Sequence, residues 1–578
     1  MHLAIFWAGL ASNDTLSGHR QLIRSTLLRN RPSREIFISI ACAISAFGYS
    51  VGFRILDITH VRWLYVGDSA QAYLGWEFFR RTPLLQFPLG VNPEFGKGFD
   101  SSVVFSDSIP LIAVILKPVS RIIDVPVQYF GWWLLLAFVA QAILSIKILS
   151  LLGVPSPARL VALPILLLQP VLLDRMSFEG YGHMGLSAHW LILLGIWMYL
   201  RPHTRHWEWT VALLVAIGVT FYYFIILGIF FLGWVVVDVL GHSSRRRALQ
   251  RHVSRSFAIL VTSVVFTGLL GGFTSGGLGD TGLGTYRATL ASVFDAATLN
   301  GPRWTLLSFL PDIPNPPGSQ EGFGFLGVAG FILLALAAIQ VSVWVPRLAS
   351  LRTMVLVGTA GLFVVLALSP RIALGPREIA SYTWPEVIEE ALSVVRASGR
   401  LIWIPIYLSS FASIAIITAK REWKSNVAVS LVALVSLVHV ADTTHAVASV
   451  RSRFTETEVA LITDGPRWDA WAAGKKHLVA IPPLSNDPRW IDLAVFANRH
   501  QLTTTAAYVS RKDEFSFAQL ANDSQRLLER RDFSSDTLYV ITNYPPNPES
   551  VRLFAEARGS KASPYRVFQV EELTVVVP

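Results

Sequence analysis

The stretch VALLVAIGVTFYYFIILGIFFLGWVVVDVL, residues 211–240, contains a single charged residue, Asp238, and is otherwise almost entirely apolar. A helix needs about 20 apolar residues to cross the hydrocarbon core of a bilayer. These thirty residues are long enough for two helices with a turn near 221–223. A helix that is apolar on all sides lacks the polar face of a surface helix. The stretch therefore predicts a pair of membrane-spanning helices.

Comparable apolar runs recur along the chain. They cover 36–52, 130–152, 160–173, 188–200, 257–270, 325–345, 354–368, 401–418 and 427–440. Together with residues 211–240 they predict about eleven transmembrane helices. Composition agrees, because 52% of the residues are hydrophobic, 15% are charged and the mean hydropathy is +0.48. These values exclude most water-soluble enzymes and predict an α-helical polytopic membrane protein.

The charged residues predict the orientation of these helices. The net charge is +10, but the basic residues cluster at the ends of alternate apolar runs and form no groove or recognition helix, which argues against nucleic acid as a partner. The positive-inside rule makes those ends cytoplasmic. It assigns 1–35 to a cytoplasmic tail and 36–441 to the transmembrane domain, with large external loops at 54–126, 271–324 and 369–399.

Residues 442–578 have a different pattern. Strand-like runs at 477–482, 537–542, 565–570 and 573–577 alternate with helix-like runs at 490–500, 517–531 and 548–558. Such alternation is typical of a small soluble α/β domain. Because the N-terminus is predicted to be cytoplasmic and the number of spans is odd, this domain is expected on the opposite side of the membrane, in the periplasm of a bacterial cell. It contains no glycine-rich phosphate loop and no nucleophile elbow, so we expect the chemistry elsewhere.

The first external loop is the richest in acidic residues. Within it, 69–81 is expected to form a helix lying flat on the membrane, and 109–123 a second juxtamembrane helix. Asp68 directly precedes the first of these helices and Asp107 the second. Each is explained either as a helix cap or as a carboxylate that works as a base or orienting group.

A second group of ionisable residues lies around the external turn 174–187. It comprises Arg175, Glu179, His183 and His189. Ionisable groups at this depth are usually functional or paired, and a structural Arg175–Glu179 pair is the simpler alternative. Glu179 and His183 are four residues apart, so on a helix they would share one face and could bind a metal ion together. The H-x-x-x-H and H-E-x-x-H spacings of helical zinc sites are absent, so the sequence does not identify a metal.

Arg396 and Arg400 flank the short sequence ASG just before the apolar run 401–418. A guanidinium binds phosphate oxygens through two parallel hydrogen bonds, so these arginines are candidates for a lipid phosphate. The alternative is that both anchor the chain at the headgroup level. Tyr286, Asp312, Gln320 and Glu321, in the second external loop, are candidates for binding a polar ligand. The alternative for each is an ordinary role in a loop or turn.

Five short segments of the sequence resemble known proteins. They are GDSAQAYLGWEFFR (67–80), FSDSIPLIAVILKP (105–118), GHMGLSAHWLILL (182–194), FLPDIPNPPGSQEGFGFLG (309–327) and RASGRLIWIP (396–405). With the predicted topology, the chain resembles the GT-C superfamily of membrane glycosyltransferases. These segments are most similar to those of a GT-C-like family of bacterial integral membrane proteins whose function is unassigned. The resemblance implies transfer of a sugar from a polyprenyl-phosphate carrier and an essential acidic residue in the first loop, here Asp68.

We therefore expect an inverting glycosyltransferase of the bacterial inner membrane, with a lipid-linked glycan, lipopolysaccharide or protein as its periplasmic acceptor. Asp68 and Asp107 are the predicted catalytic residues, and a divalent cation, Mg²⁺ or Mn²⁺, is a possible cofactor. Two sets of binding residues complete the prediction: Arg396, Arg400 and Arg175 for the donor phosphate, and Glu179, His183, His189, Tyr286, Asp312, Gln320 and Glu321 for the substrate.

Three alternatives stay open. A glycan polymerase or ligase using a polyprenyl-pyrophosphate substrate would place its key residues in a later loop. A lipid-linked glycan transporter would show charges in the middle of its helices and internal repeats. The central spans carry few charges beyond Lys147 and Asp238. A membrane scaffold would not depend on Asp68.

Overall fold

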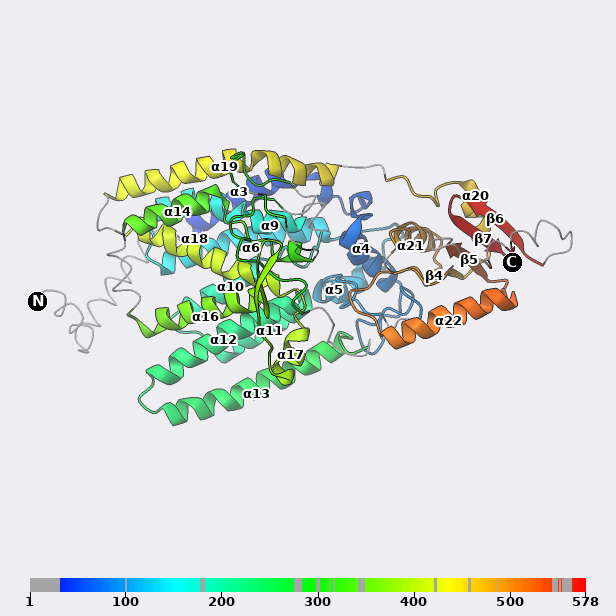
Figure 1. Cartoon of the computed structure of the whole chain (residues 1–578), viewed down its shortest axis with the longest axis horizontal. Coiled ribbons are helices and arrows are strands. Elements are labelled where there is room, and N and C mark those ends of the chain that lie inside the picture. Colours follow the sequence, from blue (N-terminus) through cyan, green and yellow to red (C-terminus); the bar gives the residue numbers. More distant parts are fainter. Residues whose placement is uncertain are drawn as a thin grey trace, which may run out of the picture.

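The computed structural model describes residues 32–98, 101–176, 182–274, 283–297, 302–310, 312–314, 316, 318–340, 349–419, 424–455, 459–485, 487–542, 549, 552–553 and 564–578. The described chain forms a bundle of apolar helices and a smaller part built around a β-sheet. Figure 1 shows the bundle helices running side by side on the left, the sheet on the right, and helices α4 and α5 between them.

The bundle consists mainly of long helices. They are α3 (Pro32–Ser50), α6 (Phe130–Leu151), α10 (Trp190–Leu200), α11 (His206–Val219), α12 (Phe221–Gly241), α13 (Arg245–Leu269), α14 (Gly327–Ile339), α16 (Leu351–Leu368), α18 (Trp403–Ile417) and α19 (Ser425–Thr455). The two helices predicted within 211–240 are confirmed. The chain turns at Thr220, whose backbone is extended between α11 and α12.

Within the described residues, seven helical segments are long and apolar enough to cross a membrane. They are 130–151, 221–241, 245–269, 319–339, 351–368, 398–417 and 425–455. The chain is therefore a multi-pass membrane protein. The expected number was about eleven, and the difference lies in α3, α10, α11 and the segment 160–173. The last of these is divided into α7 (Ser156–Val161), α8 (Leu163–Leu167) and α9 (Pro170–Leu173). Pro164 and Pro170 each start a new short helix, because proline cannot donate the backbone hydrogen bond that would continue the previous one.

Helix α4 (Gly67–Phe79) differs most from its expected position. Its residues from Ser69 to Phe79 are all buried, including the aromatic side chains of Tyr73 and Trp76. The expectation that this helix lies flat on the membrane is wrong. An interfacial helix would keep one face in water, whereas α4 is enclosed between the bundle and the C-terminal part of the chain (Figure 1). Helix α5 (Pro110–Ser120) lies beside it.

The third expected loop, 369–399, has structure of its own. It contains the hairpin of β1 (Arg371–Leu374) and β2 (Arg377–Ser381), followed by helix α17 (Glu386–Ser393). A short 3₁₀ helix, Ser398–Ile402, then leads directly into α18.

The C-terminal part is a mixed α/β domain, as predicted. Its five-stranded sheet has the order β4-β3-β5-β7-β6, where β3 is His477–Ile481, β4 Thr503–Thr504, β5 Thr537–Thr542, β6 Arg566–Val570 and β7 Leu573–Val577. Strand β3 pairs in parallel with β4 and β5, and β7 is antiparallel to β5 and β6. The helices are α20 (Pro466–Ala472), α21 (Trp490–Arg499) and α22 (Glu514–Arg530).

Helix α19 connects the two parts. It has 31 residues and continues past 441, so the expected boundary between the transmembrane and C-terminal domains falls inside one helix. At about 1.5 Å per residue such a helix is about 46 Å long, which exceeds a hydrocarbon core of about 30 Å. Its C-terminal end therefore extends beyond the membrane, where Arg453 and Phe454 are buried in the protein.

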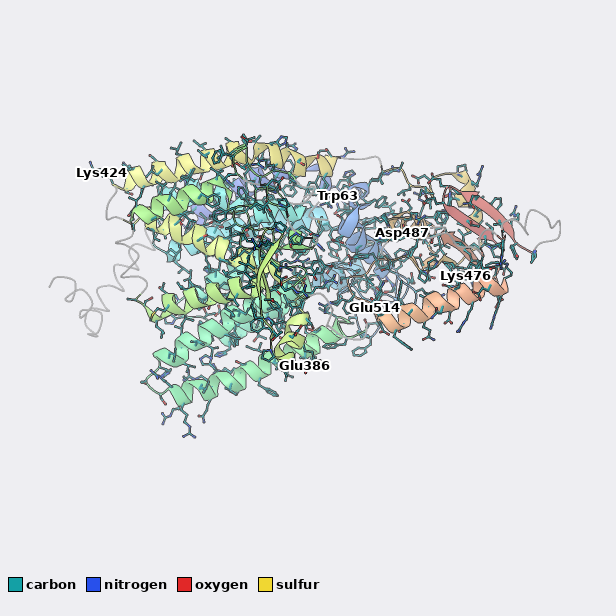
Figure 2. All side chains as sticks on the ribbon, viewed as in Figure 1. Trp63, Glu386, Lys424, Lys476, Asp487 and Glu514 are labelled. Atoms are coloured by element: carbon teal, nitrogen blue, oxygen red, sulfur yellow. The ribbon has the colours of Figure 1, made fainter. Side chains whose placement is uncertain are left out.

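The first loop also joins the C-terminal sheet. The carbonyl of Thr504 accepts hydrogen bonds from Gly96 N (3.1 Å) and Lys97 N (2.8 Å), and Phe95 forms a parallel bridge with Thr504. The Phe95 ring packs between Phe78 of α4 and Trp490 of α21. Figure 2 shows the two ends of the molecule: Lys424 lies at the far end of the bundle, and Lys476, Asp487 and Glu514 lie on the C-terminal domain.

Candidate functional site

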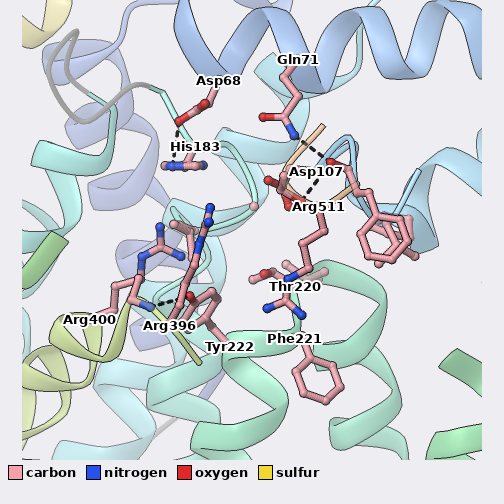
Figure 3. A pocket seen from close by; sticks show the side chains of 18 of the residues that line it. Asp68, Gln71, Asp107, His183, Thr220, Phe221, Tyr222, Arg396, Arg400 and Arg511 are labelled. Atoms are coloured by element: carbon pink, nitrogen blue, oxygen red, sulfur yellow. Dashed lines mark hydrogen bonds and ion pairs between the residues drawn. The ribbon is translucent and has the colours of Figure 1, made fainter. Parts of the chain in front are cut away.

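A cavity of about 330 Å³ lies where the bundle, the first loop and the C-terminal domain meet. Its wall combines α4, residues 104–110, the start of α12, residues 394–400 and the C-terminal residues Tyr508, Ser510 and Arg511. Figure 3 shows Asp68 and Gln71 reaching down from α4, with Arg396, Arg400 and Tyr222 on the opposite side. Acidic and basic side chains thus face each other across one space.

Asp68 is paired with a histidine. Its Oδ2 atom lies 2.8 Å from Nε2 of His183, and both side chains are about 15% exposed, which leaves them open to the cavity. The expected alternative, a helix cap, is not found. The N-cap position of α4 is Val66, and no side chain caps this end. Asp68 sits in the first turn, where the helix dipole favours a negative charge.

A buried arginine lies behind this pair. Arg453 donates from Nη1 to the carbonyl of Met176 (2.7 Å) and from Nη2 to the hydroxyl of Ser69. It is close enough to Asp68 for the two charges to attract. Gly182 makes room for it, because a Cβ atom there would lie 1.9 Å from the same Nη2. Helix α19 thus supplies a positive charge near Asp68.

Asp107 lies in a tightly held loop. Its φ of 53° is left-handed, as is that of Ile109 at 49°. This conformation is uncommon for residues with a side chain but is tolerated by aspartate. The loop is fixed from α4, where Gln71 Nε2 donates to the Phe105 carbonyl (2.8 Å) and Ser108 Oγ donates to the Ala72 carbonyl (2.8 Å).

This conformation directs Asp107 into the cavity rather than onto a helix end. The N-cap position of α5 is Ile109, so Asp107 is not its cap. Burial raises the pKa of Asp107, the nearby negative charge of Asp68 raises it further, and His183 acts in the opposite direction. The two carboxyl groups therefore differ in environment, which is how paired acids take different roles.

On the basic side of the cavity, two tyrosine rings contact the arginines. The Tyr222 hydroxyl accepts a hydrogen bond from Ala397 N (3.0 Å), and the Arg400 guanidinium lies 4.4 Å from the centre of the Tyr222 ring. Arg396 lies 5.4 Å from the centre of the Tyr286 ring. Aromatic faces attract cations, so the two rings hold the guanidiniums at the cavity wall.

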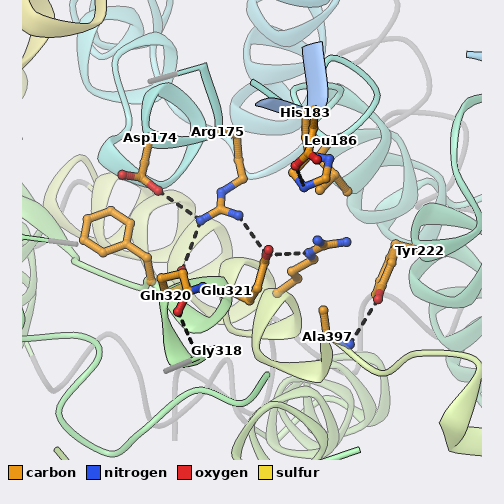
Figure 4. A network of polar contacts seen from close by, with 12 residues as sticks. Asp174, Arg175, His183, Leu186, Tyr222, Gly318, Gln320, Glu321 and Ala397 are labelled. Carbon is orange, nitrogen blue, oxygen red and sulfur yellow. Dashed lines mark hydrogen bonds and ion pairs between the residues drawn. The ribbon is translucent and has the colours of Figure 1, made fainter. Parts of the chain in front are cut away.

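Glu321 orients Arg400 from behind. Its Oε2 atom accepts hydrogen bonds from Arg400 Nε and from Arg175 Nη1, both at 2.9 Å (Figure 4). Arg175 also bonds Asp174 (3.0 Å) and the carbonyl of Gln320 (3.1 Å). Two arginines share the Glu321 carboxylate and Asp174 balances the second positive charge, which explains how such polar groups are accommodated in a buried position.

The cavity brings together eight of the predicted site residues. They are Asp68, Asp107, His183, Tyr286, Gln320, Glu321, Arg396 and Arg400. Three others do not line it. Arg175 lies behind Glu321. Asp312 is exposed on the second loop. His189 is fully buried in the bundle, with Nδ1 3.0 Å from the Tyr407 hydroxyl and its ring against Trp403. Glu179 and the proposed Arg175–Glu179 pair fall outside the described residues.

The described donors do not assemble into a metal site. Within the described part of the chain, no three His, Cys, Asp or Glu side chains are placed to hold a metal ion. Asp68 and Asp107 are oxygen donors of the kind that Mg²⁺ prefers, but the nearest third donor, His183, is hydrogen-bonded to Asp68.

The C-terminal domain contributes residues that the sequence did not predict for the site. Tyr508, Ser510 and Arg511 line the cavity, although they follow Asp107 by some four hundred residues. Burial and the negative charge of Asp68 raise the pKa of Tyr508 to about 12, so its hydroxyl keeps its proton at neutral pH. No sequence motif marks these residues. The only local signal is the clustering of aromatic, hydroxyl and basic residues in YVSRK, 508–512.

Comparison with known families gives two adjoining matches. Residues 40–444 match the family described as a domain of unknown function (DUF6311), and residues 467–578 match the DUF6311 C-terminal domain. No curated protein matches the chain. The first match covers the bundle with the acidic and basic sides of the cavity, and the second covers the domain that closes it. The chain, a multi-pass membrane protein, therefore belongs to the DUF6311 family.

Proposed function

We propose that the chain is a membrane glycosyltransferase that moves a sugar from a polyprenyl-phosphate donor to an acceptor hydroxyl at the outer face of a bacterial inner membrane. One observation carries the proposal: the cavity places the carboxylates of Asp68 and Asp107 opposite the guanidiniums of Arg396 and Arg400. Its position at the membrane end of the C-terminal domain suits a donor that is anchored in lipid. The resemblance of the five sequence segments to the GT-C superfamily supports the same activity.

In the proposed reaction, the acceptor hydroxyl loses its proton to Asp68 as its oxygen attacks the anomeric carbon of the donor sugar. The bond between that carbon and the phosphate oxygen breaks, and the electron pair leaves with the phosphate. Because the new bond forms on the opposite face, the anomeric configuration inverts. His183 orients Asp68 through the 2.8 Å contact between its Nε2 atom and Oδ2 of Asp68, and Arg453 supplies a positive charge nearby.

The leaving phosphate needs positive charge as its own charge develops. Arg396 and Arg400 line the cavity and supply that charge. Glu321 fixes Arg400 through Nε, which sets the direction of the guanidinium. Fixed donors of this kind require little rearrangement during the reaction. Tyr286 and Gln320 line the same space and are assigned to the sugar hydroxyls.

The test is transfer of radiolabelled sugar by the whole protein in lipid nanodiscs. Polyprenyl-phosphate and polyprenyl-pyrophosphate donors are offered with membrane glycan extracts as acceptors. Asp68→Asn is compared with the wild type. Since general-base catalysis contributes about 10²–10⁴-fold, we expect at least a hundredfold loss of transfer rate. Transfer only from pyrophosphate donors would favour the polymerase or ligase alternative.

The matched control is Asp124→Asn, an exposed aspartate of the same loop that does not line the cavity. It should transfer sugar at the wild-type rate. Thermal unfolding shows whether each variant is folded. A folded Asp68→Asn variant with full activity would overturn the assignment of the base. A wild type that is inert with every donor, but that moves labelled lipid-linked glycan across the membrane of sealed proteoliposomes, would favour a transporter.

A further inference from the structure

The C-terminal segment 503–511 is fixed to both sides of the cavity. On the side of the first loop, Ser510 donates from its backbone N (2.7 Å) and from Oγ (2.9 Å) to the carbonyl of Phe105. On the opposite side, Arg511 Nη2 donates to the carbonyl of Val394 (2.8 Å). Phe105 precedes Asp107 by two residues and Val394 precedes Arg396 by two. The segment thus bridges the loop that carries the carboxylate and the loop that carries the arginine.

The segment is also held firmly within its own domain. Thr505 Oγ1 accepts a hydrogen bond from Ala480 N of β3 (2.8 Å), and Ala507 N donates to the carbonyl of Leu484 (2.9 Å). The Tyr508 ring stacks on Trp490 of α21, with ring centroids 6.3 Å apart. Arg511 therefore reaches the cavity from a rigid support, which is what positions a binding side chain accurately.

The arginines around the cavity offer hydrogen-bond donors to an anion beside Arg511. Three arginines line it, Arg396, Arg400 and Arg511. Glu321 and Asp174 balance the charges of Arg400 and Arg175, and Glu321 contacts Arg400 through Nε. In Figure 3 the Arg511 side chain extends from the right toward Thr220, and Arg396 and Arg400 stand on the left of the same space. A phosphate between them would meet guanidiniums on two sides.

We propose that Arg511 is a third phosphate-binding residue, so that the C-terminal domain supplies part of the site for a lipid-linked phosphate. The inference deepens the proposed function and rests on it. It assigns a role to the C-terminal domain that its own sequence motifs do not suggest. A guanidinium can hold a phosphate through two parallel hydrogen bonds, and lysine offers the charge without that geometry.

The experiment measures binding of a polyprenyl phosphate to the whole protein in nanodiscs, with the phosphate-free polyprenol as the comparison ligand. Arg511→Gln, Arg511→Lys and Arg400→Gln are compared with the wild type. Loss of a hydrogen bond to a charged group corresponds to about a tenfold or greater rise in Kd. We expect at least that for Arg511→Gln, a smaller rise for Arg511→Lys, and no change in polyprenol binding. Thermal unfolding confirms that each variant is folded.

Arg526→Gln is the matched control, because Arg526 lies on the exposed side of α22 and pairs only at the surface with Asp523. It removes the same charge from the same domain and should leave Kd unchanged. If Arg400→Gln weakens binding and folded Arg511→Gln and Arg511→Lys do not, the inference is overturned and the proposed function stands. If the wild type binds the phosphate no better than the polyprenol, the phosphate site itself is wrong. If Arg526→Gln weakens binding as much as Arg511→Gln, the effect is one of overall charge and the inference is likewise overturned.

Discussion

The two carboxylates of the cavity differ because their neighbours differ. Asp68 faces His183 and has Arg453 behind it, so its charge is balanced. Asp107 is half-buried in the same cavity as Asp68 and is held in a left-handed conformation by hydrogen bonds of the surrounding loop. A proton is therefore harder to remove from Asp107 than from an ordinary aspartate. Residues kept in such costly states are concentrated at functional sites.

This difference predicts an unusual effect of Asp107→Asn on stability. Burial raises the pKa of Asp107 above its value in the unfolded chain. The wild type therefore loses stability as the pH rises through the native pKa. Asparagine carries no such charge and also tolerates the left-handed conformation. We expect Asp107→Asn to unfold at a higher temperature than the wild type at about pH 8, and the gap to shrink toward the ordinary carboxyl pKa of 3.8.

The measurement is the thermal unfolding temperature of both proteins in detergent at several pH values, with sugar transfer followed in parallel. Asp124→Asn, at an exposed position, should leave the unfolding temperature unchanged. A gap that stays constant over the pH range would mean that the pKa of Asp107 is the same in the folded and the unfolded chain. An Asp107→Asn variant that is less stable at every pH would show that the carboxylate itself holds the loop together.

At the scale of elements, the site depends on how closely α4 approaches the loop that carries Asp107. Gly75 faces this loop, and a Cβ atom there would lie 2.4 Å from Cβ of Ser106 and 2.3 Å from its Oγ. The Cβ of Ser106 cannot rotate away, so any side chain at 75 displaces the loop backbone. Asp107 directly follows Ser106, so a methyl group at position 75 would also displace Asp107 and change the shape of the cavity.

We therefore expect Gly75→Ala to reduce sugar transfer strongly and to lower the unfolding temperature. Overpacking of a tight contact costs about 1–3 kcal/mol. Gly228→Ala is the control, because nothing lies within 4 Å of a Cβ at that position of α12. That variant should keep its activity and its stability, since alanine favours a helix more than glycine does. Equal behaviour of the two variants would contradict the close approach.

The elements that could be predicted from the sequence are those decided by local composition. The runs 130–152 and 427–440 contain enough apolar residues to predict spans, and the structure has helices there. Prolines within 160–173 were visible, but their effect depends on neighbouring helices that support the broken segment. Helix α4 was misplaced for a related reason. Its aromatic residues fit an interfacial helix equally well, and only the distant C-terminal domain decides that they are buried.

On the scale of the whole molecule, the bundle and the C-terminal domain share one interface. Phe95 lies at its centre, fully buried between Phe78 and Trp490, and its backbone pairs with Thr504. The cavity stands next to this interface, so its shape depends on both parts. Asp68 and Arg396 could be proposed from sequence because each stands in a short, chemically unusual stretch, whereas Arg511 acquires its role only through this interface.

Phe95→Ala should loosen both sides of the interface together. Removal of a buried phenylalanine side chain costs about 3–5 kcal/mol. Hydrogen exchange followed by mass spectrometry should become faster in peptides covering 67–79 and 503–511 alike. Phe515→Ala is the control, because Phe515 is 77% exposed on α22. Faster exchange in only one of the two regions would show that the domains are stabilised independently.

The bridge between Phe105 and Ser510 has a consequence for biosynthesis. The two residues are 405 positions apart, and a chain is made from its N-terminus at about 5–20 residues per second. Asp68 and Asp107 therefore leave the ribosome at least about 20 seconds before the segment that closes the cavity. Throughout that interval the C-terminal domain is not yet present to cover helix α4. The cavity can therefore be completed only after residues 503–511 have been made.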